Sequence, residues 1–271
     1  YHIPAVDYSE GVKTAYPQGV QAKEFILPKE LLEQDCVISL SKMKTHALER
    51  ITGAVKNSYG FVYGFHKAKG HTQYPSADSF ARMLIDLNKC VAPKLYVMDG
   101  IVAMEGNGPG SGDPVPMNVL LMSTDPVALD SVFSRLVYLK PEMVPTNYHG
   151  EKMGLGTWKE EEITLLTPDG EISMAEAVKK YGNPAFNVDR TEVRKNIWTR
   201  MAGALNIFQK KPYIEADKCV RCGICVQSCP VPGKAVDFRK GKGKPPVYDY
   251  RKCIRCFCCQ EMCPKKAIKV K

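Results

Sequence analysis

The chain has 271 residues, a formal net charge of +9, 44% hydrophobic residues and 25% charged residues. These values are ordinary for a globular protein, and the length allows one sizeable core with a small additional domain. No run of about 18 apolar residues occurs, so a membrane span is not expected. The sequence begins at Tyr1, without a start signal, so we expect a processed chain or one that lacks an N-terminal part. A signal peptide that has been removed is one of the alternatives.

Short apolar runs alternate with helical patterns over the first 182 residues. Three runs predict buried strands, at 35–40 (DCVISL), 94–100 (KLYVMDG) and 118–122 (NVLLM). Such continuous runs are typical of a sheet covered on both faces. We therefore predict an α/β domain with a mainly parallel sheet and helices on both faces.

Capping residues mark three helices of this domain. The caps are Ser76, Thr124 or Asp125 followed by Pro126, and Ser173 with Glu176, and Gly182 is a stop signal. Residues 183–212, which include the helical pattern TEVRKNIWTRMAGALNIF, are predicted to form a helical connector.

Polar side chains follow the first predicted strand, in the segment SKMKTHALERITGAVKN. Their cations, hydroxyl, amide and imidazole groups suit a phosphate or carboxylate ligand. They are Lys42, Lys44, Thr45, His46, Lys56 and Asn57. We predict catalytic roles for His46, as a proton donor or acceptor near neutral pH, and for Lys44. The competing interpretation is a solvated basic loop.

A glycine-rich segment, MDGIVAMEGNGPGSGD (98–113), follows the second strand. Its glycines would let the backbone approach a cofactor closely, and its polar groups could bind that cofactor. The candidates are Asp99, Glu105, Gly106, Asn107, Gly108 and Gly110. The segment lacks the Walker ending, so a loop without a ligand is equally favoured. A third segment, NYHGEKMGLGT (147–157), is better explained as a surface turn.

Nine of the 11 cysteines lie between positions 219 and 263. Two runs, CVRCGICVQSCP and CIRCFCCQEMCP, repeat one spacing and end at proline. This spacing resembles that of bacterial two-cluster ferredoxins, in which the fourth cysteine of each run binds the other 4Fe-4S cluster. The implied ligand sets are Cys219, Cys222, Cys225 with Cys263, and Cys253, Cys256, Cys259 with Cys229.

Cys258 is the cysteine left over from these two sets, and packing or weak S–H donation to cluster sulfur is its expected role. Structural zinc sites are the alternative interpretation, but a duplicated four-cysteine run closed by proline favours clusters. Residues 213–271 are thus predicted to form a small α+β two-cluster ferredoxin-like domain.

The charge of the chain is uneven. Residues 207–271 carry 16 Lys and Arg against 5 Asp and Glu. A basic tail could indicate nucleic-acid binding, but negatively charged clusters would use part of this excess, so nucleic acid is an unfavoured alternative. Tightly spaced CxxC pairs are typical of metal binding in a reducing compartment, so we predict a cytoplasmic protein.

The chain also resembles the uncharacterised family numbered 362 among the domains of unknown function, in the version fused to a C-terminal ferredoxin. The stretches that carry the resemblance are VISLSKMKTHALERITGAVKN, FARMLIDLN, LYVMDGIVAMEGNGPGSGDP, MNVLLMSTDPVALDSV and PTNYHGEKMGLG. The resemblance implies that roughly another hundred residues precede Tyr1 in the family, and it implies no settled reaction.

These features predict an iron–sulfur oxidoreductase. Two 4Fe-4S clusters would relay electrons to or from a small anionic substrate, or a flavin or deazaflavin cofactor, bound by residues 1–182. The alternative is a non-catalytic electron-transfer or cluster-assembly protein whose α/β domain recognises a redox partner protein.

Overall fold

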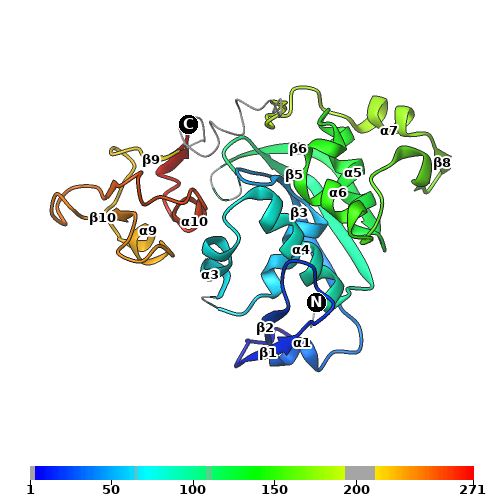
Figure 1. Ribbon diagram of the computed structural model, residues 1–271. Helices are drawn as coiled ribbons and strands as arrows, with labels where there is room; N and C mark the ends of the chain where they lie inside the picture. The colour runs from blue at the N-terminus through cyan, green and yellow to red at the C-terminus, as the bar shows by residue number, and fades with distance from the viewer. Residues whose placement is uncertain (1–3, 65, 109, 111, 193–210) are drawn as a thin grey trace, which may run out of the picture.

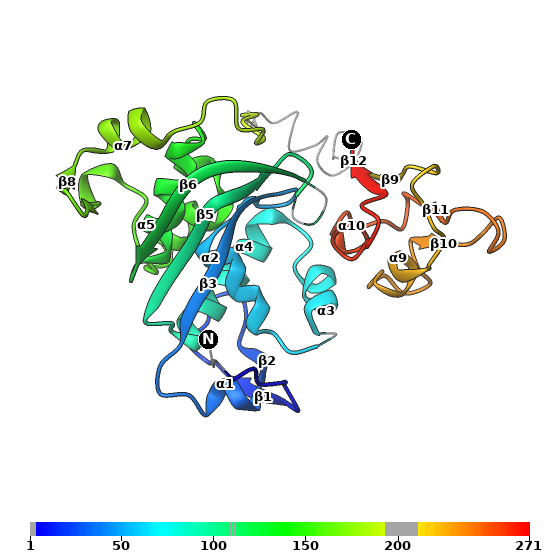
Figure 2. The same ribbon diagram turned by 180° about the vertical axis from the view of Figure 1, so that it is seen from behind.

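The computed structural model describes residues 4–64, 66–108, 110, 112–192 and 211–271. It consists of a larger α/β part and a smaller cysteine-rich part, residues 211–271 (Figure 1). Both ribbon views place helix α10 (Cys258–Glu261) of the smaller part beside the α/β part, on the side of helix α3 (His66–Gln73) (Figures 1 and 2). Part of the predicted connector, residues 193–210, lies outside the described residues.

The central sheet has four strands in the order β4 (Arg50–Thr52), β3 (Ile38–His46), β5 (Leu95–Glu105) and β6 (Asp113–Ser123). Strand β3 pairs with β5 in parallel, whereas β4 and β6 run antiparallel to their neighbours. The predicted mainly parallel arrangement is therefore not confirmed, because β4 and β6 return through short connections that permit only antiparallel pairing.

One face of the sheet packs against α2 (Ala54–Asn57) and α5 (Pro126–Leu136), and α4 (Ala77–Val91) packs against α2 on the same side (Figure 2). Along β3 the burial alternates as a strand requires, with Ser39, Ser41 and Met43 buried under the helices. Ile38 and Leu40 on the other face are 53% and 72% exposed. Among the described residues, helices on both faces are therefore not found.

Local sequence signals explain where the main helices begin. The Ser76 hydroxyl accepts from the Ser79 amide and starts α4, and the Asp125 carboxylate accepts from two amides at the start of α5. Ser173 forms the predicted capping box with Glu176 at α7 (Met174–Tyr181). These caps satisfy backbone donors that would otherwise lack partners.

The remaining elements of the α/β part are short and surround the central sheet. They are β1 (Gly11–Ala15), β2 (Glu24–Pro28), α1 (Lys29–Leu32), η1 (Ser58–Phe61), η2 (Pro141–Met143), α6 (Pro145–Lys152), η3 (Glu160–Glu162), β7 (Leu165–Thr167) and β8 (Gly170–Ile172). None of the helices in the described ranges is long and apolar enough to cross a bilayer.

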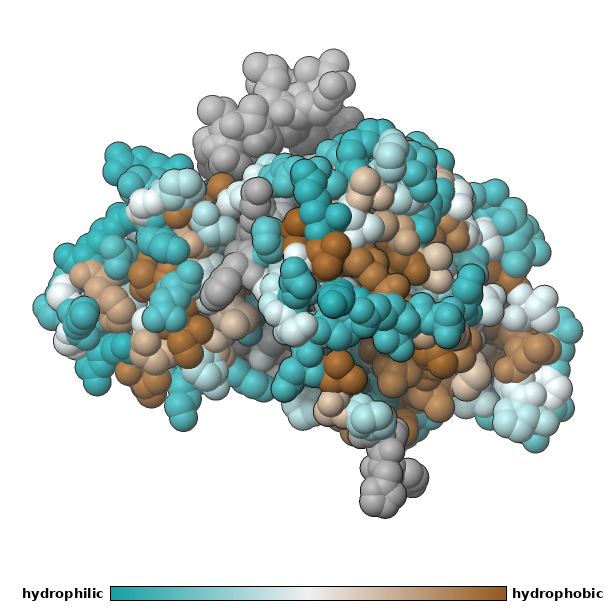
Figure 3. Space-filling view, turned by 90° about the horizontal axis from the view of Figure 1, so that it is seen from below, coloured by the Kyte–Doolittle hydropathy of each residue, from teal (hydrophilic) through white to brown (hydrophobic). Residues whose placement is uncertain are grey.

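The cysteine-rich part, which we call the module, is held by two small antiparallel sheets. Strand β9 (Pro212–Ile214) pairs with β12 (Ile268–Val270), and β10 (Val236–Asp237) pairs with β11 (Val247–Tyr248). Helices α9 (Ile224–Gln227) and α10 each follow the second cysteine of a run. In Figure 3 the module, at the left, is mainly hydrophilic, whereas apolar side chains gather over the α/β part.

Candidate functional site

Two small cavities in the module are each lined by four cysteines. One cavity, the cluster I site, is lined by Cys219, Cys222, Cys225 and Cys263. The other, the cluster II site, is lined by Cys229, Cys253, Cys256 and Cys259. Each set supplies the four thiolates that a 4Fe-4S cluster takes, and each includes the fourth cysteine of the opposite run. The donor chemistry of both cavities therefore fits a cubane cluster.

Local backbone conformation wraps each run around its cavity. Arg221 and Gly223 in the first run have positive φ, as do Arg255 and Phe257 in the second. Because residues at matching positions adopt the left-handed backbone conformation, both loops turn back on themselves in the same way.

The fourth cysteines are also held alike. The Ala235 amide donates to the Cys229 sulfur and the Ala267 amide to the Cys263 sulfur, both at 3.3 Å. Such N–H···S bonds are among the features that set cluster potentials.

Cys258 lines neither cavity and is buried. A hydrogen bond from Cys258 to Cys256 lowers the pKa of the Cys256 thiol. The leftover cysteine thus touches a residue of the cluster II site. No three His, Cys, Asp or Glu side chains in the described part of the chain converge on a single metal ion. A cubane requires no such convergence, because each of its irons takes one thiolate.

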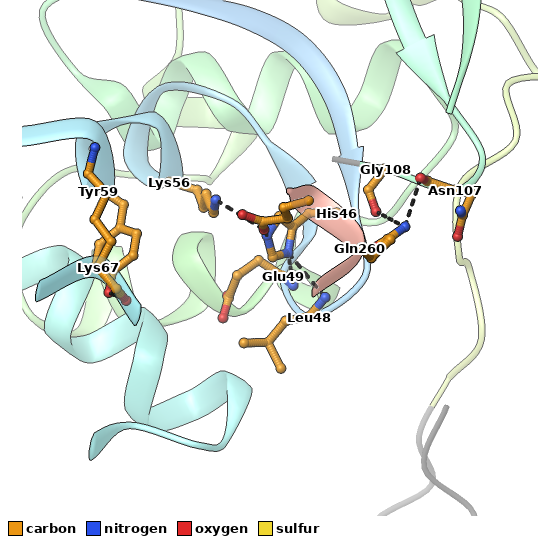
Figure 4. Close-up of polar contacts among 10 residues, drawn as sticks. His46, Leu48, Glu49, Lys56, Tyr59, Lys67, Asn107, Gly108 and Gln260 are labelled. Atoms are coloured by element: carbon orange, nitrogen blue, oxygen red, sulfur yellow. Dashed lines mark hydrogen bonds and ion pairs between the residues drawn. The ribbon is translucent and has the colours of Figure 1, made fainter. Parts of the chain in front are cut away.

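Helix α10 joins the cluster II site to the α/β part (Figure 4). The Gln260 side-chain amide donates to the carbonyl oxygens of Asn107 and Gly108 at 3.0 and 3.1 Å. In return, the Asn107 side-chain amide donates to the Ile268 carbonyl at 3.2 Å. Gln260 is completely buried, so these polar groups are sealed inside a contact between the two parts.

Glu261, the last residue of α10, contacts the basic segment that follows the first strand. Its carboxylate lies 3.2 Å from His46 Nε2 and 4.0 Å from Lys56 Nζ. The amides of Leu48 and Glu49 both donate to His46 Nδ1 at 3.1 Å. Because Nδ1 accepts two hydrogen bonds, the neutral imidazole carries its proton on Nε2 and donates it to Glu261.

Burial and neighbouring lysines set the charges here. Burial, helped by the charge of Lys56, lowers the pKa of His46 to about 4, so the ring is neutral near pH 7. Burial and Lys56 also lower the pKa of Lys44. Burial opposes ionisation of Glu261, but Lys56 and the bond from His46 outweigh it and hold its pKa well below the usual range. Glu261 is therefore a carboxylate among cationic neighbours.

A cavity of about 260 Å³ opens beside this contact. Its wall combines both predicted segments with side chains from residues 187–189 and the end of β12. The lining residues are Thr45, His46, Ala47, Arg50, Gly106, Asn107, Gly108, Asn187, Val188, Asp189 and Val270. The space suits a small molecule, which would lie beside the helix that carries Cys259.

The glycines of the predicted cofactor loop serve close packing. A Cβ at Gly108 would lie 2.1 Å from the Thr45 carbonyl oxygen, and one at Gly110 would lie 3.0 Å from the Glu261 carbonyl oxygen. The Thr45 hydroxyl donates to the Gly106 carbonyl at 3.1 Å. The loop thus lies against both β3 and the module. Much of segment 98–113 is strand, because β5 extends to Glu105 and β6 begins at Asp113.

Three predicted residues lie away from this junction. Lys42 pairs with Asp99 at 2.6 Å, and both side chains are substantially exposed. A register shift between Lys42 and Lys44 separates these two lysines along β3. The Asn57 amide donates to Ser39 and Leu40 on β3.

Two other predicted residues or segments hold local structure. Glu105 accepts from the Asn187 amide at 2.7 Å, next to the cavity. In the third segment, His149 lies in α6 and contacts Asp78 at 2.8 Å.

Sequence reasoning missed Arg50, Gln260 and Glu261. Arg50 lines the cavity, and its guanidinium donates to the Asp189 carbonyl at 2.6 Å. A signal for the other two was present in the duplicated run, where Gln260 and Glu261 occupy the positions of Val226 and Gln227. This difference between the equivalent helices α9 and α10 marks the copy that contacts the α/β part.

Comparisons with known proteins agree with this division. Residues 1–135 match the family model described as Domain of unknown function (DUF362), and residues 211–264 match that of a 4Fe-4S dicluster domain. The chain therefore carries a DUF362 domain and a 4Fe-4S dicluster domain. The dicluster domain corresponds to the module described above. This match supports a role of the module in iron–sulfur electron transfer.

A protein of Synechocystis sp. named a thylakoid-associated protein is 42% identical to the chain over 130 residues. The match covers 48% of this chain and 40% of that relative, so the chain spans well under two thirds of the relative's length. No solved structure matches the chain.

Proposed function

We propose that the chain is an iron–sulfur oxidoreductase in which the cluster II site exchanges electrons with a small anionic substrate at the junction of the two domains. One observation carries this proposal. Helix α10, which holds Cys259, brings Gln260 and Glu261 against Asn107 and His46, two residues predicted to bind or transform a ligand. A cluster at the cluster II site would supply single electrons, because the helix that holds its ligand Cys259 contacts the wall of the cavity.

The residues at the junction have distinct roles in this proposal. Lys44 and Lys56 attract the anion, because two lysines lie beside the one carboxylate of Glu261. Asp189, the other carboxylate near the cavity, pairs with Arg50 at 3.8 Å. Arg50 stands in the cavity wall and orients a carboxylate or phosphate. His46 keeps its Nε2 proton on the Glu261 carboxylate, so this proton reaches a ligand only where the ligand replaces Glu261 as its acceptor.

The test compares two lysines on one strand. The full chain is purified without oxygen, reduced with dithionite, and the absorbance of its clusters is followed while small carboxylates and phosphate esters are added. We expect Lys44→Met to lower the affinity for any anion that reoxidises the clusters. Lys42→Met is the matched control, because Lys42 pairs with Asp99 away from the junction. Equal effects of the two substitutions would contradict the assignment of the site.

The same protein tests the cofactor prediction. About eight irons and eight sulfides per chain are expected from two 4Fe-4S clusters. No family match points to a flavin or deazaflavin. That part of the prediction would be supported by an organic chromophore that loses its absorbance when the clusters are reduced. The cytoplasmic location stays part of the proposal, and the thylakoid association in the printed name belongs to the relative.

A second candidate function rests on the Glu261 contact. Because Glu261 already lies between His46 and Lys56, the basic segment also serves to dock the module. This favours a non-catalytic electron carrier or cluster-assembly protein whose DUF362 domain recognises a partner. Under this alternative, none of the added anions reoxidises the reduced clusters.

A further inference from the structure

The two cluster sites have unlike surroundings. The cluster II site adjoins α10 and the DUF362 domain, and its ligands Cys229 and Cys259 are buried. In the cluster I site, Cys222 is exposed. Both ribbon views place the loop between β10 and β11 at the end of the module farthest from the α/β part (Figures 1 and 2). The cluster I site is therefore the more exposed of the two to a molecule from outside.

The β10–β11 loop belongs to the same surface as the cluster I site. The Arg221 guanidinium, beside Cys222, donates to the Gly243 carbonyl of the loop at 3.0 Å. Pro246 of the loop lines the cluster I cavity together with Lys265. Contacts at the middle and at the C-terminal end of the loop thus hold it next to this cavity.

Exposed cations surround an apolar spot on this surface. Val220 is 53% exposed beside Cys222. The residues of this surface, which we call the cluster I face, are Lys218, Val220, Arg221, Lys240, Lys242, Lys244 and Lys265. The carboxylates close in sequence to these residues are Glu215, Asp217, Asp237 and Asp249. Glu215 pairs with Lys218 at 2.7 Å, and Asp249 pairs with Arg239 at 3.5 Å. The outer end of the module is correspondingly hydrophilic in Figure 3.

Compensation of cluster charge does not account for all of these cations. Lys240, Lys242 and Lys244 are exposed, and within the described ranges none of them lies within ion-pair distance of a carboxylate. Because these exposed ammonium groups have no carboxylate partner in the described part of the chain, their charges are available to a partner in solution. An apolar centre surrounded by charges of one sign is typical of surfaces that dock a charged protein.

We propose that the cluster I face docks an acidic one-electron carrier protein, which reduces the chain from outside. Per encounter the carrier loses one electron and the cluster I site gains it, without making or breaking a covalent bond. The electron then passes through the cluster II site to the DUF362 domain. The direction of this last step rests on the proposed function, whereas the docking surface does not depend on it.

The test measures electron transfer to the full holoprotein from a reduced plant-type ferredoxin, used as an acidic probe protein. Stopped-flow absorbance gives the second-order rate constant at low salt and at 1 M salt. The test variant combines Lys240→Glu, Lys242→Glu and Lys244→Glu. The control combines Lys179→Glu and Lys180→Glu, at the end of α7 in the α/β part.

We expect the test variant to lose about tenfold or more in rate at low salt, because electrostatic steering contributes factors of 10–10³. At 1 M salt, where the Debye length is about 3 Å, its rate should approach that of the parent protein. The control variant should be unchanged. Unaltered iron content and complete reduction by dithionite would show that the variant is folded and that its clusters are intact.

An equal rate for the parent and the test variant at low salt would overturn the proposal. If the same variant also loses binding to a fluorescent single-stranded DNA, the lysines are assigned to nucleic acid. Neither result bears on the anion-dependent reoxidation that tests the proposed function, so the two proposals can fail separately.

Discussion

Replacement of Gln260 by alanine should release the module from the DUF362 domain. The side-chain amide of Gln260 makes two buried hydrogen bonds, to the carbonyl oxygens of Asn107 and Gly108. Each contributes about 1 kcal/mol net, and loss of a partner adds the cost of unsatisfied carbonyls. We therefore expect the docked state to lose about 2–3 kcal/mol, which lowers the ratio of docked to undocked molecules about 30- to 160-fold.

Hydrogen exchange measured by mass spectrometry reports this change. The amides of Leu48 and Glu49 depend on His46 Nδ1, which in turn is held by Glu261, so peptides covering residues 45–49 should exchange faster in Gln260→Ala. The control is Gln227→Ala, on the exposed twin helix α9. Unchanged exchange in Gln260→Ala, at unchanged iron content, would refute the assignment of Gln260 to docking.

Three further predictions follow from the geometry. Gly108→Ala should lower the free energy of unfolding by about 1–3 kcal/mol, measured with denaturant, because a Cβ would lie 2.1 Å from the Thr45 carbonyl oxygen. Iron analysis should show a full complement in Cys258→Ala and loss of about half the iron in Cys263→Ala, and equal iron in both variants would contradict the assigned sets. His46 has a folded pKa of about 4, below its ordinary value of about 6.5, so its contribution to stability is complete above pH 6.5 and lost as the pH falls toward 4. The part of the loss at pH 5 that belongs to His46 is about 2 kcal/mol; it should be missing from His46→Gln and retained in His66→Gln, because His66 is exposed. The part due to buried His71, whose pKa is lowered to about 3, should remain in both variants.

Local features of the fold could be predicted from the sequence. The caps at Ser76, Asp125 and Ser173 are confirmed, because a cap depends on a side chain and amides only two or three residues away. The apolar runs correctly placed three strands, although β3 and β5 continue well beyond them. Apolar periodicity gives no information on strand direction, so the mixed pairing was missed.

Only the side of the junction that belongs to the α/β part could be predicted from the sequence. The basic and glycine-rich segments drew attention because their residue types suit a ligand, and the structure brings His46 and Asn107 to one cavity. Their partner Glu261 is separated from His46 by 215 positions, and no local pattern joins residues so far apart. Lys42 and Lys44 looked equivalent in sequence, but Lys42 pairs with Asp99 of β5, whereas Lys44 lies beyond the register shift and opposite Thr52 of β4.

The pairing of β9 with β12 has a consequence for biosynthesis. These strands are the first and last of the module, and Lys211 and Lys271 exchange backbone hydrogen bonds beside them. The sheet that these two strands form, next to the junction, can therefore close only after residues through Val270 have left the ribosome. The central sheet is complete at Ser123, so the DUF362 side of the junction can form while the cysteine runs are still being synthesised. Cluster insertion is thus expected after translation, onto a docking surface that is already in place.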